Sequence, residues 1–153
     1  MTTWDDVLAA VTLAFAGPSD EARTALTSCW EATGPDQPAH RCVLAHYLAD
    51  QQHDVAQETA WDERALVAHA HVGDEDLAPI GVPSARSFAP SLHLNLGDDY
   101  LRLGRVDDAT LQLRRARASD QVLAVEGYGA MIRAGLDRLE TRIAASRTGA
   151  GHG

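Results

Sequence analysis

The residues with the clearest chemical potential are a cysteine, a histidine and an aspartate spaced four residues apart. Cys42, His46 and Asp50 share one face of a helix, because side chains at i and i+4 are neighbours there. A thiolate and an imidazole so placed can ligate a transition metal, and the carboxylate can be a third ligand or orient the imidazole. No second such pair occurs, since His69 and His71 point in different directions on a helix. We therefore favour a histidine bonded to Asp50 that helps line a polar groove.

Besides metal binding and a polar groove, the histidines and aspartates could also catalyse a reaction. His46 or His93 would be the general base, with Asp50, Asp98 or Asp99 as its partner. A general base must lie within hydrogen-bond reach of the reacting group and have a pKa near the working pH. The sequence has no nucleophile motif, no phosphate-binding glycine loop and no HExxH metal helix. We therefore expect a protein that is not an enzyme and needs no cofactor.

Composition and charge narrow the class of protein. The 153 residues fit one domain, and 45% hydrophobic residues with only 5% aromatics and no β-branched runs favour helices. The formal net charge of −9 argues against nucleic acid and anionic membranes as partners. The lack of a long apolar run and the acidic start MTTWDDVLAA predict no membrane span, no signal peptide and a cytoplasmic location. Cys29 and Cys42 are too few for a disulfide framework, so we expect both to be small buried hydrophobes.

The helices that position these residues are clearest in residues 90–119, PSLHLNLGDDYLRLGRVDDATLQLRRARAS. Apolar residues recur there at three- and four-residue steps, as they do on one face of a helix. Gly97 lies beside that face, where a missing side chain lets another helix approach closely. Gly104 supplies the left-handed position that ends a helix without a Cβ clash. The stretch therefore predicts two antiparallel helices. Their apolar positions are Ala89, Leu92, Leu96, Tyr100 and Leu103, then Val106, Ala109, Leu113 and Ala116.

This hairpin resembles a tetratricopeptide repeat, a helix-turn-helix unit with small residues at fixed places. The matching residues are Leu96, Gly97, Tyr100, Gly104, Ala109, Leu113 and Ala116. His93 stands where that family has an aromatic residue, and the closing proline is absent. The stretches HRCVLAHYLAD, WDERAL and SLHLNLGDDYLRLG also resemble a group of small bacterial repeat proteins. The resemblance implies an all-α, right-handed superhelical stack of hairpins.

Weaker copies of the hairpin precede residues 90–119. Thr3 and Asp6 resemble a capping box at the start of the first copy, and Gly17 divides its two helices. We expect hairpins at about 3–33, 37–71 and 90–119, a capping helix at about 123–146, and a disordered tail at 148–153. Together these make about seven helices in one domain, residues 1–147. In the second hairpin the expected buried residues are Val43, Leu44, Tyr47, Leu48, Val55, Trp61, Ala65, Leu66 and Ala68.

Two other predictions concern the last helix and the linker before the third hairpin. Val125, Tyr128, Ile132, Leu136, Leu139 and Ile143 form the expected apolar face of the capping helix. Pro79, Gly81 and Pro83 interrupt residues 73–87. That segment reads either as a mobile surface insertion or as a lid over a groove.

The resemblance also implies a binding surface, because the first helix of each tetratricopeptide hairpin lines a concave groove. Some family members hold a peptide carboxylate with an asparagine at the place of Asn95. The flanking basic residues are not matched here, and Asp98 adds negative charge, so a polar or basic ligand fits better. We expect a module, monomeric or homodimeric, that binds a protein segment or peptide; the alternative is a small-molecule or metal site at Cys42, His46 and Asp50. The expected groove residues are His46, Asp50, Ser91, Asn95, Asp98, Arg102, Glu126 and Arg133.

Overall fold

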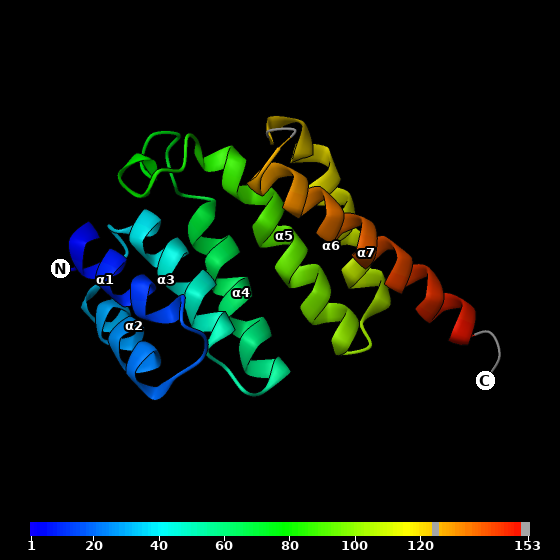
Figure 1. The fold of residues 1–153 in the computed structure, drawn as a ribbon, viewed down its shortest axis with the longest axis horizontal. Coiled ribbons are helices and arrows are strands. Elements are labelled where there is room, and N and C mark those ends of the chain that lie inside the picture. The colour runs from blue at the N-terminus through cyan, green and yellow to red at the C-terminus, as the bar shows by residue number, and fades with distance from the viewer. Residues whose placement is uncertain (124–125, 151–153) are drawn as a thin grey trace. The chain divides into compact units, whose positions relative to one another are not determined.

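The computed structural model describes residues 1–123 and 126–150, and this part of the chain is helical without any strand (Figure 1). The predicted all-α class with about seven helices is therefore confirmed. None of the described helices is both long enough and apolar enough to cross a bilayer. The α-helices are α1 Trp4–Ala14, α2 Asp20–Ala32, α3 Pro38–Asp50, α4 Val55–His69, α5 Ala85–Arg102, α6 Val106–Ser119 and α7 Tyr128–Ala150, with 3-10 turns η1 Ala78–Ile80 and η2 Asp120–Val122.

Contacts between Cα atoms divide the chain into two compact units, residues 1–85 and 86–153. Each unit is described by itself below. The single domain expected for residues 1–147 stays a prediction, because two compact units can still fold together.

The first hairpin begins and turns where the sequence indicates. The Thr3 hydroxyl accepts a hydrogen bond from the Asp6 amide, and the Asp6 carboxylate accepts one from the Thr3 amide, so the predicted capping box is present. Gly17 has a φ of 103°, a left-handed value that ends the first helical segment. The Ser19 hydroxyl then caps α2 by accepting from the Ala22 amide.

The core of residues 1–85 is built around α3, which packs against α1, α2 and α4. Of the residues expected inside the second hairpin, the α3 side chains Val43, Leu44 and Leu48 are buried, as is Ala65 on α4. The expectation is wrong for the remaining residues, which are only partly buried: Tyr47, Val55, Trp61, Leu66 and Ala68. Cys42 is buried as predicted, whereas Cys29 is partly exposed. The sulfur of Cys29 approaches the Asp6 carbonyl oxygen at 3.6 Å.

The linker before α5 is anchored by one apolar side chain. Leu77 is fully buried, and the turn η1 that follows it contacts α1. Gly81 has a φ of 82° and closes this turn, and the Asp76 carboxylate accepts a hydrogen bond from the Gly73 amide. The linker lies earlier in the chain than predicted, because α4 ends at His69 and α5 already begins at Ala85.

Helix α5 starts five residues before the predicted Pro90, which lies inside it. Proline lacks an amide hydrogen and crowds the carbonyl group one turn earlier, so a helix usually begins at such a residue or ends before it. Here Pro90 is fully buried, and Ala85 and Phe88 on the same helix are also buried. Burial of this apolar surface outweighs the preference of proline for the start of a helix, so α5 continues through Pro90.

Gly97 is a point of close approach between α5 and its neighbours α6 and α7. A Cβ at Gly97 would lie 2.9 Å from Cδ2 of Leu139, 3.4 Å from Cβ of Gln112 and 3.6 Å from the Ala109 carbonyl oxygen. Gly104 has a φ of 80° and ends the helix as predicted. The small-residue pattern of the third hairpin therefore serves close packing.

Helix α7 differs from the predicted capping helix at both ends. It begins at Tyr128 and not near 123, because Gly127 has a φ of 60°, which a right-handed helix excludes. It continues through Ala150, so the predicted tail is wrong for 148–150. Val125 and residues 151–153 lie outside the described residues. Ile132, Leu136, Leu139 and Ile143 are buried as predicted, whereas Tyr128 is 50% exposed.

Candidate functional site

Cys42, His46 and Asp50 follow one face of α3 but lie in different environments. Cys42 is completely buried, and burial raises the pKa of its thiol to about 12. Burial also lowers the pKa of His46 to about 4, so its imidazole is neutral at pH 7. Asp50 is an exposed residue, yet the pKa of its carboxyl group is raised. The main cause is partial desolvation, and the smaller cause is repulsion from the Glu58 carboxylate. The face thus presents a thiol, a neutral imidazole and one carboxylate.

These properties do not favour metal binding or catalysis at this face. A cysteine ligand must be deprotonated, and a fully buried thiol with a pKa of about 12 resists that. The ligand atoms of Cys42, His46 and Asp50, all of them described residues, do not come within 4.8 Å of one another as a group. A base with a pKa of about 4 is also weak at neutral pH. His46 instead lies edge-on to Tyr47, with 5.1 Å between the ring centroids.

The other histidine considered as a base is His93 on α5. Its Nδ1 lies 2.7 Å from Oε1 of Gln112 on α6, within hydrogen-bond distance. The Gln112 side chain is buried, so this contact joins the two helices of the hairpin in their interior. His93 therefore has a packing role at the place where the tetratricopeptide pattern has an aromatic residue.

On α5, Ser91 and Asn95 have different surroundings. Ser91 is buried, its hydroxyl donates to the Phe88 carbonyl oxygen, and a further hydrogen bond joins it to Tyr128. The pKa of Tyr128 is raised because burial of its hydroxyl end outweighs that hydrogen bond. Asn95, one turn further along α5, is partly exposed. Asn95 is therefore accessible to a partner, whereas Ser91 is not.

A charged cluster occupies the next turn of α5. The carboxylate of Asp98 pairs with the guanidinium groups of Arg102 and Arg142, the latter on α7. Arg102 also pairs with the buried Asp99, at 2.8 Å. The side chains of Asp98 and Arg142 are 34% and 48% exposed, so a ligand can reach this cluster. Two carboxylates and two guanidinium groups balance, so the cluster is neutral as a whole.

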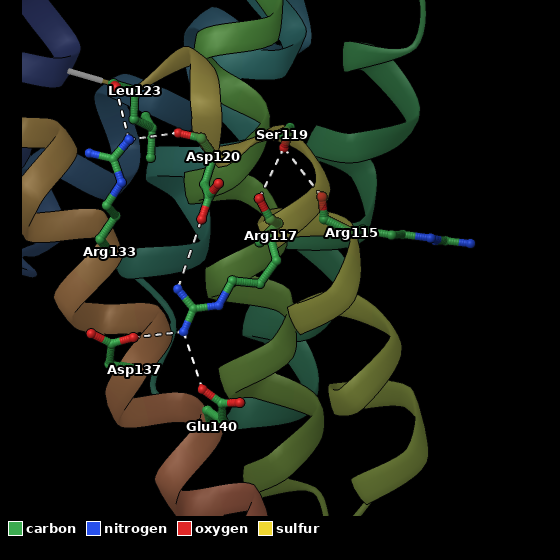
Figure 2. A network of polar contacts seen from close by, with 9 residues as sticks. Arg115, Arg117, Ser119, Asp120, Leu123, Arg133, Asp137 and Glu140 are labelled. Carbon is green, nitrogen blue, oxygen red and sulfur yellow. Dashed lines mark hydrogen bonds and ion pairs between the residues drawn. The ribbon is translucent and has the colours of Figure 1, made fainter. Parts of the chain in front are cut away.

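The last two predicted site residues, Glu126 and Arg133, lie away from this cluster. Glu126 is exposed, just before α7. Arg133 donates from its guanidinium to the carbonyl oxygens of Asp120 and Leu123, each at 2.9 Å (Figure 2). In the same view Arg117 of α6 reaches Asp137 and Glu140 of α7. Arg133 and Arg117 thus join α7 to α6 and the turn that follows it.

Replacing Arg133 with methionine is expected to lower the free energy of unfolding by about 1–2 kcal/mol, because two carbonyl oxygens lose a charged donor. Chemical denaturation measures this change. Arg138→Met is the matched control, since Arg138 is exposed on the same helix without an ion pair to another described residue. Equal losses for both variants would show that the Arg133 hydrogen bonds contribute nothing specific.

Arg142 is the residue of the cluster that the sequence did not indicate. It lies 44 positions from Asp98, and no periodicity relates the two.

A contact on α4 could have been found from spacing. Trp61 and Arg64 are three residues apart, a distance at which helix side chains are neighbours, and the guanidinium of Arg64 covers the indole of Trp61 at 4.3 Å.

The fold and these polar clusters define the class only as an all-α helical protein. Comparison with protein-family models, curated proteins and solved structures found no significant match to the chain.

Proposed function

We propose that this chain is a tetratricopeptide-like interaction module whose helix α5 binds an extended protein segment or peptide. The single observation that carries the proposal is the exposed cluster of Asp98, Arg102 and Arg142, which follows Asn95 on α5 and is charge-balanced together with the buried Asp99. Helix α5 is the first helix of its hairpin, and the first helices line the groove in tetratricopeptide repeats. A cytoplasmic location belongs to the same proposal.

The chemistry of these side chains suits a peptide main chain. The Asn95 amide can both donate to and accept from backbone groups. The ion pairs hold Asp98 and Arg142 in place, so less side-chain entropy is lost when a ligand binds. Because the cluster is neutral as a whole, hydrogen-bond geometry would select the ligand more than its net charge would.

The alternative function, small-molecule or metal binding at Cys42, His46 and Asp50, lacks such an observation. Its thiol is buried and protonated, and its imidazole is a weak base. We therefore do not extend the proposal to that face.

The test compares quantitative affinity capture by the wild type and by an Asn95→Ala, Arg142→Gln double variant. Arg102 is kept because it also pairs with the buried Asp99. Proteins bound at α5 should be enriched about tenfold less by the variant, since two central contacts are lost. Arg138→Gln is the control on α7 and should leave the profile unchanged. Identical profiles for wild type and double variant would contradict the assignment to α5.

A further inference from the structure

Four side chains from three helices form a continuous stack on residues 1–85. Arg41 of α3 covers the ring of Trp30 on α2, with 4.7 Å from its guanidinium carbon to the ring centroid. Trp30 meets Trp61 of α4 edge to face, at 5.0 Å between ring centroids and an interplanar angle of 87°. Arg64 covers Trp61 at 4.3 Å. We name these four residues the Arg–Trp stack.

The two arginines of the Arg–Trp stack keep donors available. A guanidinium that lies flat on an aromatic ring is held by cation–π attraction and can still donate from its edge. Arg64 is exposed and forms no hydrogen bond or ion pair with any other residue that the structure describes. Arg41 donates from Nε to the Thr33 hydroxyl at 2.9 Å and pairs with no carboxylate of the described residues. By contrast Arg102, Arg117 and Arg142 are all paired with carboxylates.

The indoles add apolar surface between these charges. Trp30 and Trp61 are both partly exposed. Tryptophan and arginine are the residues most enriched among those that dominate the energy of protein interfaces. The Arg–Trp stack therefore offers two oriented guanidinium groups beside an apolar platform.

We infer that the Arg–Trp stack binds an acidic protein segment. Its carboxylates would pair with Arg41 and Arg64, and an apolar side chain of the segment would cover the indoles. Charge complementarity carries this choice, because neither guanidinium group pairs with a carboxylate within residues 1–123 and 126–150. The negative net charge of the protein repels an acidic segment only weakly, because charges more than about 8 Å apart are largely screened at physiological salt. Nucleic acid is a poorer fit, because neutralising several phosphates needs a broader basic surface than the two guanidinium groups of the stack. This site does not depend on the function proposed for α5.

Tryptophan fluorescence tests the inference directly. In a Trp4→Phe background the remaining tryptophans, Trp30 and Trp61, both belong to the stack. The probe is a short capped peptide of alternating glutamate and leucine, and the comparison peptide has glutamine in place of glutamate. We expect the acidic peptide to change the emission and to bind at least about fivefold more tightly than the glutamine peptide.

An Arg41→Gln, Arg64→Gln variant should weaken binding of the acidic peptide by about fivefold or more. The matched control is Arg114→Gln, Arg115→Gln, which removes the same charge from an exposed part of α6. Near-ultraviolet circular dichroism verifies that the indoles keep their packing, and an Arg41→Lys, Arg64→Lys variant should retain part of the affinity. Three results would overturn the inference: no binding of the acidic peptide, equal binding of both peptides, or equal losses in the stack and control variants. Tighter binding of a thymidine oligonucleotide would do the same.

Discussion

Acidification from pH 6.5 to about pH 4 is expected to destabilise the protein through His46. Burial lowers the pKa of this side chain from 6.5 to about 4 in the folded protein. The unfolded chain restores the ordinary pKa, so between these values it binds more protons at this side chain than the folded protein does. The free energy of unfolding therefore falls as the pH falls, by up to about 1.4 kcal/mol per pH unit, and the loss is complete below the folded pKa.

Denaturant titrations across this pH window, on wild type and His46→Gln, isolate the effect. The raised pKa of Asp50 acts in the opposite direction, because its protonated form is favoured in the folded state, but this contribution is common to both proteins. The difference between the two stability curves should therefore follow His46 alone. His53→Gln, at an exposed histidine, controls for the loss of an imidazole as such. Parallel curves for wild type and His46→Gln would refute the assignment.

Gly97→Leu is the second change with a large expected effect, a loss of about 2–3 kcal/mol in the free energy of unfolding. Even a Cβ here would lie 2.9 Å from the Leu139 side chain, and the remaining leucine atoms would have to enter the space between α5, α6 and α7. Gly97→Ala should cost less, because the flexible end of Leu139 can move and alanine favours the helix.

Chemical denaturation of both Gly97 variants provides the measurement, and Gly149→Leu on α7 is the control. A Cβ at Gly149 meets no atom within 4 Å, so leucine should be neutral or slightly stabilising there. If Gly97→Leu proved as stable as the wild type, the close contact among the three helices would be absent.

The parts of the fold that the sequence predicted correctly depend on local chemistry. The capping box of Thr3 and Asp6 and the left-handed turns at Gly17 and Gly104 involve only residues close in sequence. Gly97 acts through the absence of a side chain, which the sequence shows directly. The start of α5 was missed because a local rule about Pro90 is overridden by burial of the surrounding apolar residues. The superhelical arrangement of tetratricopeptide repeats stays a prediction.

The candidate site was less predictable than the helices. Helical spacing placed Asn95, Asp98 and Arg102 correctly on one helix, but spacing does not reveal which polar groups the protein itself uses. Ser91 and Arg133 bond within the protein, and Arg142 reaches Asp98 from a distant helix. The Arg–Trp stack was missed for the same reason, because it joins three helices.

Arginine contacts also decide which longitudinal register α7 adopts. The buried stripe of Ile132, Leu136, Leu139 and Ile143 repeats at three- and four-residue steps, so sliding the helix by one or two turns would bring similar apolar side chains back to the same places. The polar contacts have no such repeat: Arg133 meets two carbonyl oxygens, Arg142 meets Asp98, and Arg147 meets Asp107. A shifted helix would lose all three at once. Apolar burial therefore holds α7 in place, while its arginines select one alignment among several nearly equivalent ones.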